Sequence, residues 1–95
     1  MSEKQRDKMF YDLADAHIGV ANEQMGQVKP SLASAAMLFA ASRFNAFVIM
    51  AASANKGEML AQKEAAIAYF LNEYETYLRE NIDEHLARYE DQAGT

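Results

Sequence analysis

The segment SLASAAMLFAASRFNAFVIMAASA, residues 31–54, decides the fold of this 95-residue chain. Apolar and small side chains occupy nearly every position, and no glycine or proline interrupts them, which predicts one long helix that is apolar nearly all round. Pro30 suits the first helical position, and Ser31 can cap the helix. The NKG sequence that follows can end it, with Asn55 or Gly57 in the left-handed conformation. Such a helix needs cover on two sides.

Arg43 stands in the middle of this apolar helix. It lies one turn from Phe39 and one turn from Phe47, so its stem can run along the rings and its guanidinium can stack on one of them. A charge in that place must also be paired or reach water. In an antiparallel hairpin, the middle of this helix lies opposite the middle of the preceding one. We therefore expect a structural ion pair from Arg43 to Asp12 or Asp15, and the alternative partners on the third helix are Tyr69, Asn72 and Glu73.

Asn45 lies on the face of the same helix that carries mostly small residues, where a second helix can come close. One buried asparagine can hydrogen-bond across such a contact and fix its register and the oligomeric state. A second interpretation stays open, in which Arg43 anchors a polar cluster that binds an anion, because arginine presents its donors as a fixed fork. The candidate residues for this ligand-binding or structural cluster are Arg43, Asn45, His17, Asp12 and Asp15.

Another helix is predicted before this segment, over about residues 3–26. Ser2 with Gln5 three residues later matches a capping box, and apolar side chains then recur at three- and four-residue spacing. Gly26 ends the pattern, and the short link after it favours an antiparallel hairpin with the helix over 31–54.

The third predicted helix covers about residues 58–90, with no glycine or proline to interrupt it, and residues 91–95 should fray. Two ion pairs with the favourable i,i+4 order are expected on its outer face, Glu75 with Arg79 and Glu84 with Arg88. An apolar stripe runs along the opposite face through Ile67, Phe70, Leu71, Tyr74, Leu78, Ile82, His85, Leu86 and Tyr89.

The third helix is longer than the others, at about 32 residues against about 24, so its end should project roughly 12 Å beyond the hairpin. An apolar stripe left in water marks a contact surface. The projecting part carries the candidate interface residues Ile82, His85, Leu86 and Tyr89. This stripe and the two apolar faces of the central helix predict a homodimer or a larger symmetric assembly. The predicted fold class is all-α: an antiparallel helical hairpin plus a long third helix in one domain, residues 1–95, similar to a three-helix bundle that oligomerisation completes.

The net charge of −5 is unevenly placed, since residues 56–95 carry four basic and nine acidic groups. This acidic part repels phosphate, so we expect neither nucleic acid nor an anionic membrane as a partner. Residues 32–52 approach the ~20 apolar residues of a membrane span, but Arg43 and Asn45 near their middle are costly in lipid. The absence of cysteine and of an apolar leader fits a soluble, cytoplasmic protein.

No catalytic constellation is visible in the sequence. His17 and His85 are the only histidines, and neither belongs to a Glu-x-x-His pair of the kind that holds metal in helical bundles. The serines of the central helix have no nucleophile elbow around them, and the isolated glycines form no phosphate-binding loop. We therefore expect no catalytic residue, no metal, no cofactor and no enzymatic activity.

The string SAAMLFAASRFNAFV, residues 34–48, resembles the signature of a family of small bacterial helical proteins described only as a domain of unknown function. In that family a SAALLYAAARFNAFV-like segment follows an N-terminal helix that contains Ala-Asn, here Ala21 and Asn22. Ser42 stands where the family has alanine more often. The resemblance implies an all-α bacterial protein and supplies no activity, substrate or cofactor.

Two functions are consistent with these observations. The first is a non-enzymatic interaction or assembly protein whose further partner the sequence does not identify. The alternative is a binder of a small anionic metabolite, held in a pocket between helices with Arg43 as its anchor and with His17 and Asn45 beside it.

Overall fold

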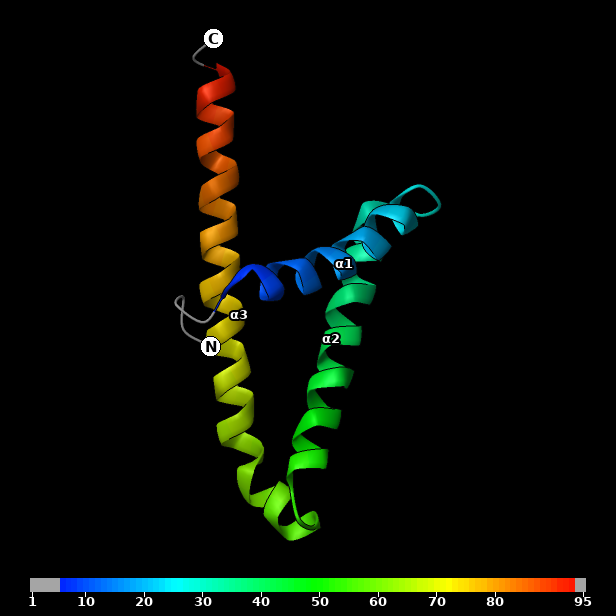
Figure 1. Cartoon of the computed structure of the whole chain (residues 1–95), viewed down its shortest axis with the longest axis vertical. Coiled ribbons are helices and arrows are strands. Elements are labelled where there is room, and N and C mark those ends of the chain that lie inside the picture. Colours follow the sequence, from blue (N-terminus) through cyan, green and yellow to red (C-terminus); the bar gives the residue numbers. More distant parts are fainter. Residues whose placement is uncertain (1–5, 94–95) are drawn as a thin grey trace. The chain divides into compact units, whose positions relative to one another are not determined.

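The computed structural model describes residues 6–93, and the side chains of residues 6–89. Three helices follow one another along the chain: α1, Lys8–Met25; α2, Pro30–Ala52; and α3, Lys56–Ala93 (Figure 1). The described residues contain no strand. The all-α fold class and the order of the three helices are confirmed.

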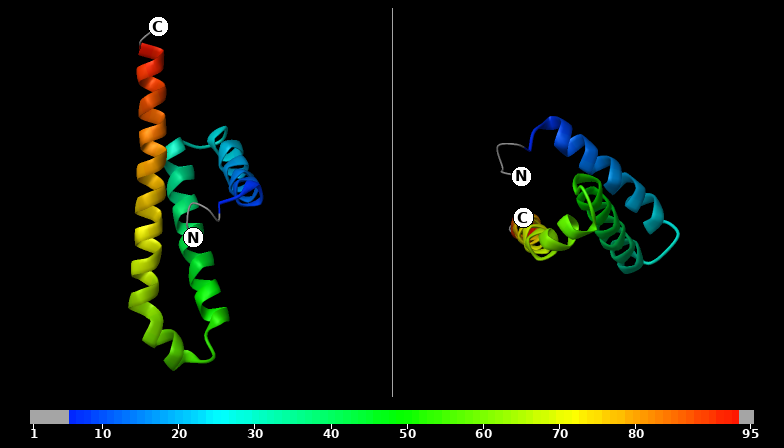
Figure 2. Two further views of the ribbon diagram at one scale, coloured as in Figure 1. Left: turned by 60° about the vertical axis from the view of Figure 1, so that its left-hand side comes forward. Right: turned by 90° about the horizontal axis from the view of Figure 1, so that it is seen from below.

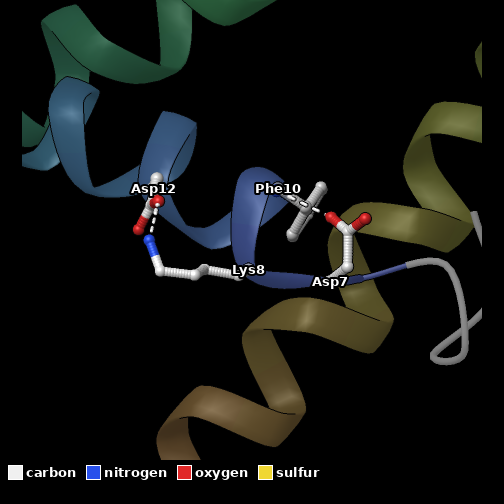
Figure 3. A network of polar contacts seen from close by, with 4 residues as sticks. All are labelled: Asp7, Lys8, Phe10 and Asp12. Atoms are coloured by element: carbon white, nitrogen blue, oxygen red, sulfur yellow. Dashed lines mark hydrogen bonds and ion pairs between the residues drawn. The ribbon is translucent and has the colours of Figure 1, made fainter.

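The first helix begins later than the sequence predicts. Asp7 is its N-cap, because Asp7 Oδ1 accepts a hydrogen bond of 3.0 Å from the backbone N–H of Phe10 (Figure 3). Lys8 and Asp12 then form an exposed ion pair of 2.7 Å one turn apart. The predicted capping box of Ser2 and Gln5 lies outside the described residues. The predicted end of the helix is confirmed, because Gly26 is the C-cap.

The second helix begins at its proline. Lys29 is the extended N-cap residue and makes no side-chain cap bond, and Pro30 occupies the first helical position as predicted. Ser31 therefore lies inside the helix, so its predicted role as a cap is wrong. At the other end Ser53 is extended, and its hydroxyl donates a 2.8 Å hydrogen bond to the carbonyl oxygen of Ile49.

Asn55 begins the third helix and does not close the second. Its Oδ1 accepts a 2.9 Å hydrogen bond from the backbone N–H of Glu58, which is an N-cap bond. No residue in the described part of the chain has a positive φ. The predicted left-handed conformation at Asn55 or Gly57 is therefore wrong, and the capping chemistry of the asparagine side chain explains why. At its far end α3 continues through Ala93, so residues 91–93 are helical where fraying was predicted.

Replacing the cap of α3 should destabilise the protein measurably. Asn55→Ala removes the acceptor for the Glu58 N–H, and we expect the free energy of unfolding to fall by about 0.5–2 kcal/mol. Asn55→Ser is the matched control, since serine also caps, and it should retain most of the stability. Urea denaturation of both variants at one protein concentration measures the effect. Equal stability of the alanine and serine variants would contradict the assigned cap.

The chain divides into two compact units, Met1–Ser53 and Ala54–Thr95. In the first unit, α1 and α2 contact each other near the loop that joins them and diverge as α1 runs back (Figures 1 and 2). Ala33, in the first turn of α2, is 3% exposed and is the one buried residue in the described part of the chain. Its small side chain lets α1 come close at that point.

The second unit consists of α3, an uninterrupted helix of 38 residues. At 1.5 Å per residue it is about 57 Å long. The two ion pairs predicted on it are confirmed, with 2.9 Å between Arg79 and Glu75 and 2.6 Å between Arg88 and Glu84. The packing of all three helices into a bundle stays a prediction.

Candidate functional site

Large apolar side chains are exposed along the whole of α2. Phe39 is 62% exposed, Phe44 is 65% exposed and Phe47 is 55% exposed. The rings of Phe44 and Phe47 lie 6.1 Å apart between centroids and form one aromatic surface on this helix. A contiguous apolar surface of this extent is typical of a contact site for protein or lipid.

Arg43 projects beside this aromatic surface. Its guanidinium carbon lies 5.9 Å from the centroid of the Phe39 ring, which confirms the predicted stacking. Asp12 is held instead by Lys8. Among the described residues no ion pair joins Arg43 to Asp12 or Asp15, so that predicted pair is wrong for this structure. The physical reason is the divergence of α1 from α2, since the pair required the middles of the two helices to lie against each other.

The other members of the predicted polar cluster do not converge either. Asn45 is half-buried on α2, whereas His17 and Asp15 are exposed on α1. Within residues 6–89 no hydrogen bond or ion pair joins any two of these side chains to one another or to Arg43. No group of three or more histidine, aspartate or glutamate residues in the described part of the chain is placed to hold a metal ion.

A shallow apolar trough lies on the second half of α3. It is lined almost wholly by carbon atoms, although two of its residues, Asn81 and His85, are polar. The four residues predicted from the sequence as an interface all contribute to it. The complete lining is Leu78, Asn81, Ile82, His85, Leu86 and Tyr89.

Each of the two polar residues of the trough makes one hydrogen bond to its own helix. His85 Nδ1 lies 2.8 Å from the carbonyl oxygen of Asn81, and the Nδ2 amide of Asn81 donates a 2.8 Å bond to the carbonyl oxygen of Tyr77. Because a carbonyl only accepts, the His85 contact places the proton on Nδ1. These bonds engage one polar atom of each residue, and the exposed surface of the trough is mostly carbon. Sequence reasoning missed Asn81, whose only signal was its place one turn before His85.

The apolar stripe of α3 is exposed except at Phe70, which is half-buried. Its other large apolar side chains are 42–71% exposed, from Leu78 at the lower value to Tyr89 at the upper. The Glu75–Arg79 and Glu84–Arg88 ion pairs lie beside the stripe and not across it. Tyr77 similarly donates a 2.6 Å hydrogen bond to Glu73 on its own helix. The polar groups next to the stripe are thus engaged within α3, and the stripe itself is left for another surface.

One helix in the described part of the chain, α2, is long and apolar enough to cross a membrane by its length and composition. Length and composition alone do not separate a membrane span from the central helix of a soluble assembly. Arg43 and Asn45 favour the second interpretation, because each is costly near the middle of a bilayer.

Comparison with known proteins gives a family and no activity. Residues 10–86 match the family described as "Protein of unknown function (DUF3144)". The match covers most of the chain and bears out the resemblance of residues 34–48 to a family of that kind. No curated protein and no solved structure matches the chain.

Proposed function

We propose that this chain, which belongs to the DUF3144 family, is a non-enzymatic interaction protein that works as a homo-oligomer. One observation carries the proposal. Ala33 is the one buried residue in the described part of the chain, whereas large apolar side chains are exposed along α2 and α3.

The energetics of folding explain why this exposure points to assembly. Ordering each residue costs about 1–2 kcal/mol of backbone conformational entropy. Apolar burial must offset that cost at about 25 cal/mol per Å², and one buried alanine falls far short of it. The helices therefore need further apolar cover, which the predicted three-helix bundle would supply in part and a second copy of the chain would complete.

Protein is a better cover for α2 than lipid. An arginine in the middle of a membrane helix costs about 2.5–3.5 kcal/mol on insertion scales. The helix α2 carries Arg43 and, in addition, the polar Asn45. In a protein contact, Asn45 can hydrogen-bond to a neighbouring helix and Arg43 can keep its ring contact while its head reaches water. Arg43 and Asn45 therefore favour an assembly in the cytoplasm.

Co-purification of two differently tagged copies tests the proposal. Both copies are expressed in one cell, and the soluble fraction is captured through the first tag without detergent. We expect the second copy to be retained in comparable amount. Retention of the first copy alone would contradict self-association. Recovery of both copies only from detergent-solubilised membranes would support a membrane-spanning α2 instead.

A second candidate function is the binding of a small anion at Arg43. The specific observation in its favour is that Arg43 forms no ion pair with any described residue. Calorimetric titration with inorganic phosphate and with succinate tests it. Binding that Arg43→Met abolishes and Lys29→Met preserves would support an anion site at Arg43. If neither phosphate nor succinate gives a heat of binding with the parent protein, Arg43 does not form a binding site for these two anions.

Arg43→Met also tests the structural role of the arginine. Because the mutation removes only a ring contact with Phe39, we expect the free energy of unfolding to stay within about 1 kcal/mol of the parent value. Urea denaturation at a fixed protein concentration gives this number. A loss of about 3 kcal/mol or more would show that Arg43 is paired with an acidic group of another copy.

A further inference from the structure

We infer that α3 pairs with α3 of a second copy in antiparallel orientation, with the two-fold axis next to Leu78. This inference rests on the proposed self-association and specifies which helix carries it, in which direction and in which register. Two features of α3 support it: the period of its apolar stripe, from which the symmetry of the stripe follows, and the distribution of charge.

The stripe repeats every 11 residues. Leu60, Leu71 and Ile82 form one series at this spacing, and Tyr74 and His85 form part of a second. Successive positions are separated by gaps of three, four and four residues, which is an 11-residue repeat. The positions that follow this repeat, which we call the seam, omit Phe70 and Leu86 of the apolar stripe and add Leu60 and Lys63. They are Leu60, Lys63, Ile67, Leu71, Tyr74, Leu78, Ile82, His85 and Tyr89.

An 11-residue repeat keeps the stripe on one side of a nearly straight helix. Eleven residues make three turns at 3.67 residues per turn, close to the natural value of the α-helix. At 100° per residue the positions from Leu60 to Tyr89 fall within an arc of about 100°. This is the width of a seam that faces another helix, and such repeats give straight or slightly right-handed supercoils. A seam of this regularity indicates that the surface packed against it is another helix with the same period.

The spacing of the seam positions is the same in both directions from Leu78. The gaps toward the N-terminus are four, three and four residues, and so are the gaps toward the C-terminus. An antiparallel pair centred on Leu78 therefore gives each position from Ile67 to Tyr89 an apolar or aromatic partner, and Leu60 and Lys63 lie outside these layers. Its layers are Leu78 with Leu78, Tyr74 with Ile82, Leu71 with His85, and Ile67 with Tyr89.

This register fills the apolar trough. The trough is formed by residues from Leu78 to Tyr89, and in the antiparallel pair they lie opposite residues 67–78 of the second copy. Leu71 and Tyr74 of the second copy then supply the side chains that enter it, in the manner of knobs in holes. A trough that exposes almost only carbon suits these side chains better than it suits a polar metabolite.

Charge disfavours the parallel alternative. Residues 83–91 carry one basic and four acidic groups, a net charge of −3, and parallel pairing would place this segment beside itself. Antiparallel pairing places it beside residues 65–73, whose single charge is Glu73. Parallel pairing would also bring Lys63 onto Lys63 within the seam. Antiparallel helices also place opposite ends of their dipoles next to each other.

The same register also brings opposite charges of the two copies together at the edge of the stripe. A two-fold axis perpendicular to the pair keeps each edge of the stripe beside the same edge of the other copy. Arg79 of the second copy then comes level with residue 77, two residues from Glu75. The exposed Glu75–Arg79 pair of one helix thus meets its symmetric counterpart, which is the arrangement that sets orientation in coiled coils.

The surface available is sufficient for a specific contact. The stripe residues from Ile67 to Tyr89 are about half exposed. Tyrosines bury up to 150–250 Å² each and aliphatic side chains less, so the stripe offers roughly 500 Å² per copy and roughly 1,000 Å² per pair. That value is at the lower limit for a specific interface, which fits an assembly in which α2 contributes a further contact.

Cysteine cross-linking in the full chain tests the inference, because the chain has no cysteine of its own. Three single variants are made, Leu78→Cys, Ile67→Cys and Tyr89→Cys, and each is oxidised alone. Ile67→Cys and Tyr89→Cys, with tags of different mass, are also mixed, dissociated, reassociated and oxidised. In the proposed register two Ile67 positions lie about 33 Å apart along the pair, which is beyond the reach of a disulfide.

We expect Leu78→Cys to cross-link to itself and the mixture to give the heterodimer. Ile67→Cys alone should cross-link at least tenfold less than Leu78→Cys. Self-cross-linking of all three single variants would overturn the inference in favour of a parallel pair. If the variants keep the oligomeric mass of the parent protein and none of the samples cross-links, the inference is also overturned. The proposed self-association would then still stand. A monomeric parent protein would overturn both.

Helix content and solution mass of each reduced variant are measured before oxidation. If a cysteine in the seam dissociates the protein, the test is repeated on the next layer. Tyr74→Cys and Ile82→Cys should then cross-link when mixed and not when alone. Cross-linking of either variant to itself would count against the antiparallel register.

Discussion

Leu78→Glu is expected to abolish pairing through α3. In the antiparallel register this substitution places two carboxylates next to each other on the two-fold axis, in a contact that otherwise excludes water. An uncompensated charge in such a place costs about 3–5 kcal/mol. The dissociation constant should therefore rise by roughly 10²–10³-fold, and the mass measured by light scattering at micromolar concentration should fall.

Thr76→Glu is the matched control for this experiment. Thr76 lies on the same helix but away from the stripe, and its hydroxyl donates a 3.0 Å bond to the carbonyl oxygen of Asn72. The same change in net charge at this position should leave the mass unchanged, because the side chain stays in water. A loss of mass in both variants would indicate general charge repulsion. An unchanged mass in Leu78→Glu would place Leu78 outside the interface.

Unfolding of the protein is expected to depend strongly on its concentration. With one buried residue in its described part, the isolated chain has little to stabilise it, so folding and association should be coupled. A hundredfold increase in concentration adds about 2.7 kcal/mol to the stability of a dimer. Because the two chains of the dimer unfold together, this corresponds to a rise in Tm of roughly 5–10 °C.

Circular dichroism melts over a hundredfold range of concentration measure this dependence. The helical signal and the loss of mass should follow the same transition. Asn55→Ser keeps the α3 cap, so its Tm should change with protein concentration as steeply as the Tm of the parent. This variant controls for local changes in the helix. A Tm that does not change with concentration would mean that the chain folds alone and that its apolar surfaces serve a different protein.

Local signals in the sequence predicted the helices well. The apolar run of α2, Pro30 at its start and Gly26 at the end of α1 act within one or two turns, and the structure confirms each of them. The two ion pairs of α3 and the contact of Arg43 with Phe39 are also local, because all three join residues four apart on one helix. Interactions of this range depend on helix geometry alone.

The features that the sequence predicted wrongly depend on competition or on tertiary packing. Several polar residues could cap each helix, and their capping energies differ by less than about 1 kcal/mol. The sequence pattern therefore could not show that Asp7 caps α1 or that Asn55 caps the start of α3. The ion pair of Arg43 with Asp12 required α1 and α2 to stay together beyond Ala33, and no local signal fixes how two helices diverge.

The candidate surface on α3 was predictable for the same local reason. Ile82, His85, Leu86 and Tyr89 share a helix face by their spacing, and the structure places them in one trough. The sequence did not reveal the hydrogen bonds that Asn81 and His85 make to their own helix, because rotamers that bond to the preceding turn leave no pattern.

The mass of the full chain in solution tests the central claim most directly. Light scattering after size exclusion is carried out without detergent over a hundredfold range of concentration. Self-association predicts a dimer or a higher symmetric multiple of the 10.6 kDa chain, with monomer found only as the helical signal is lost. A folded, helical monomer across the whole range would contradict the account.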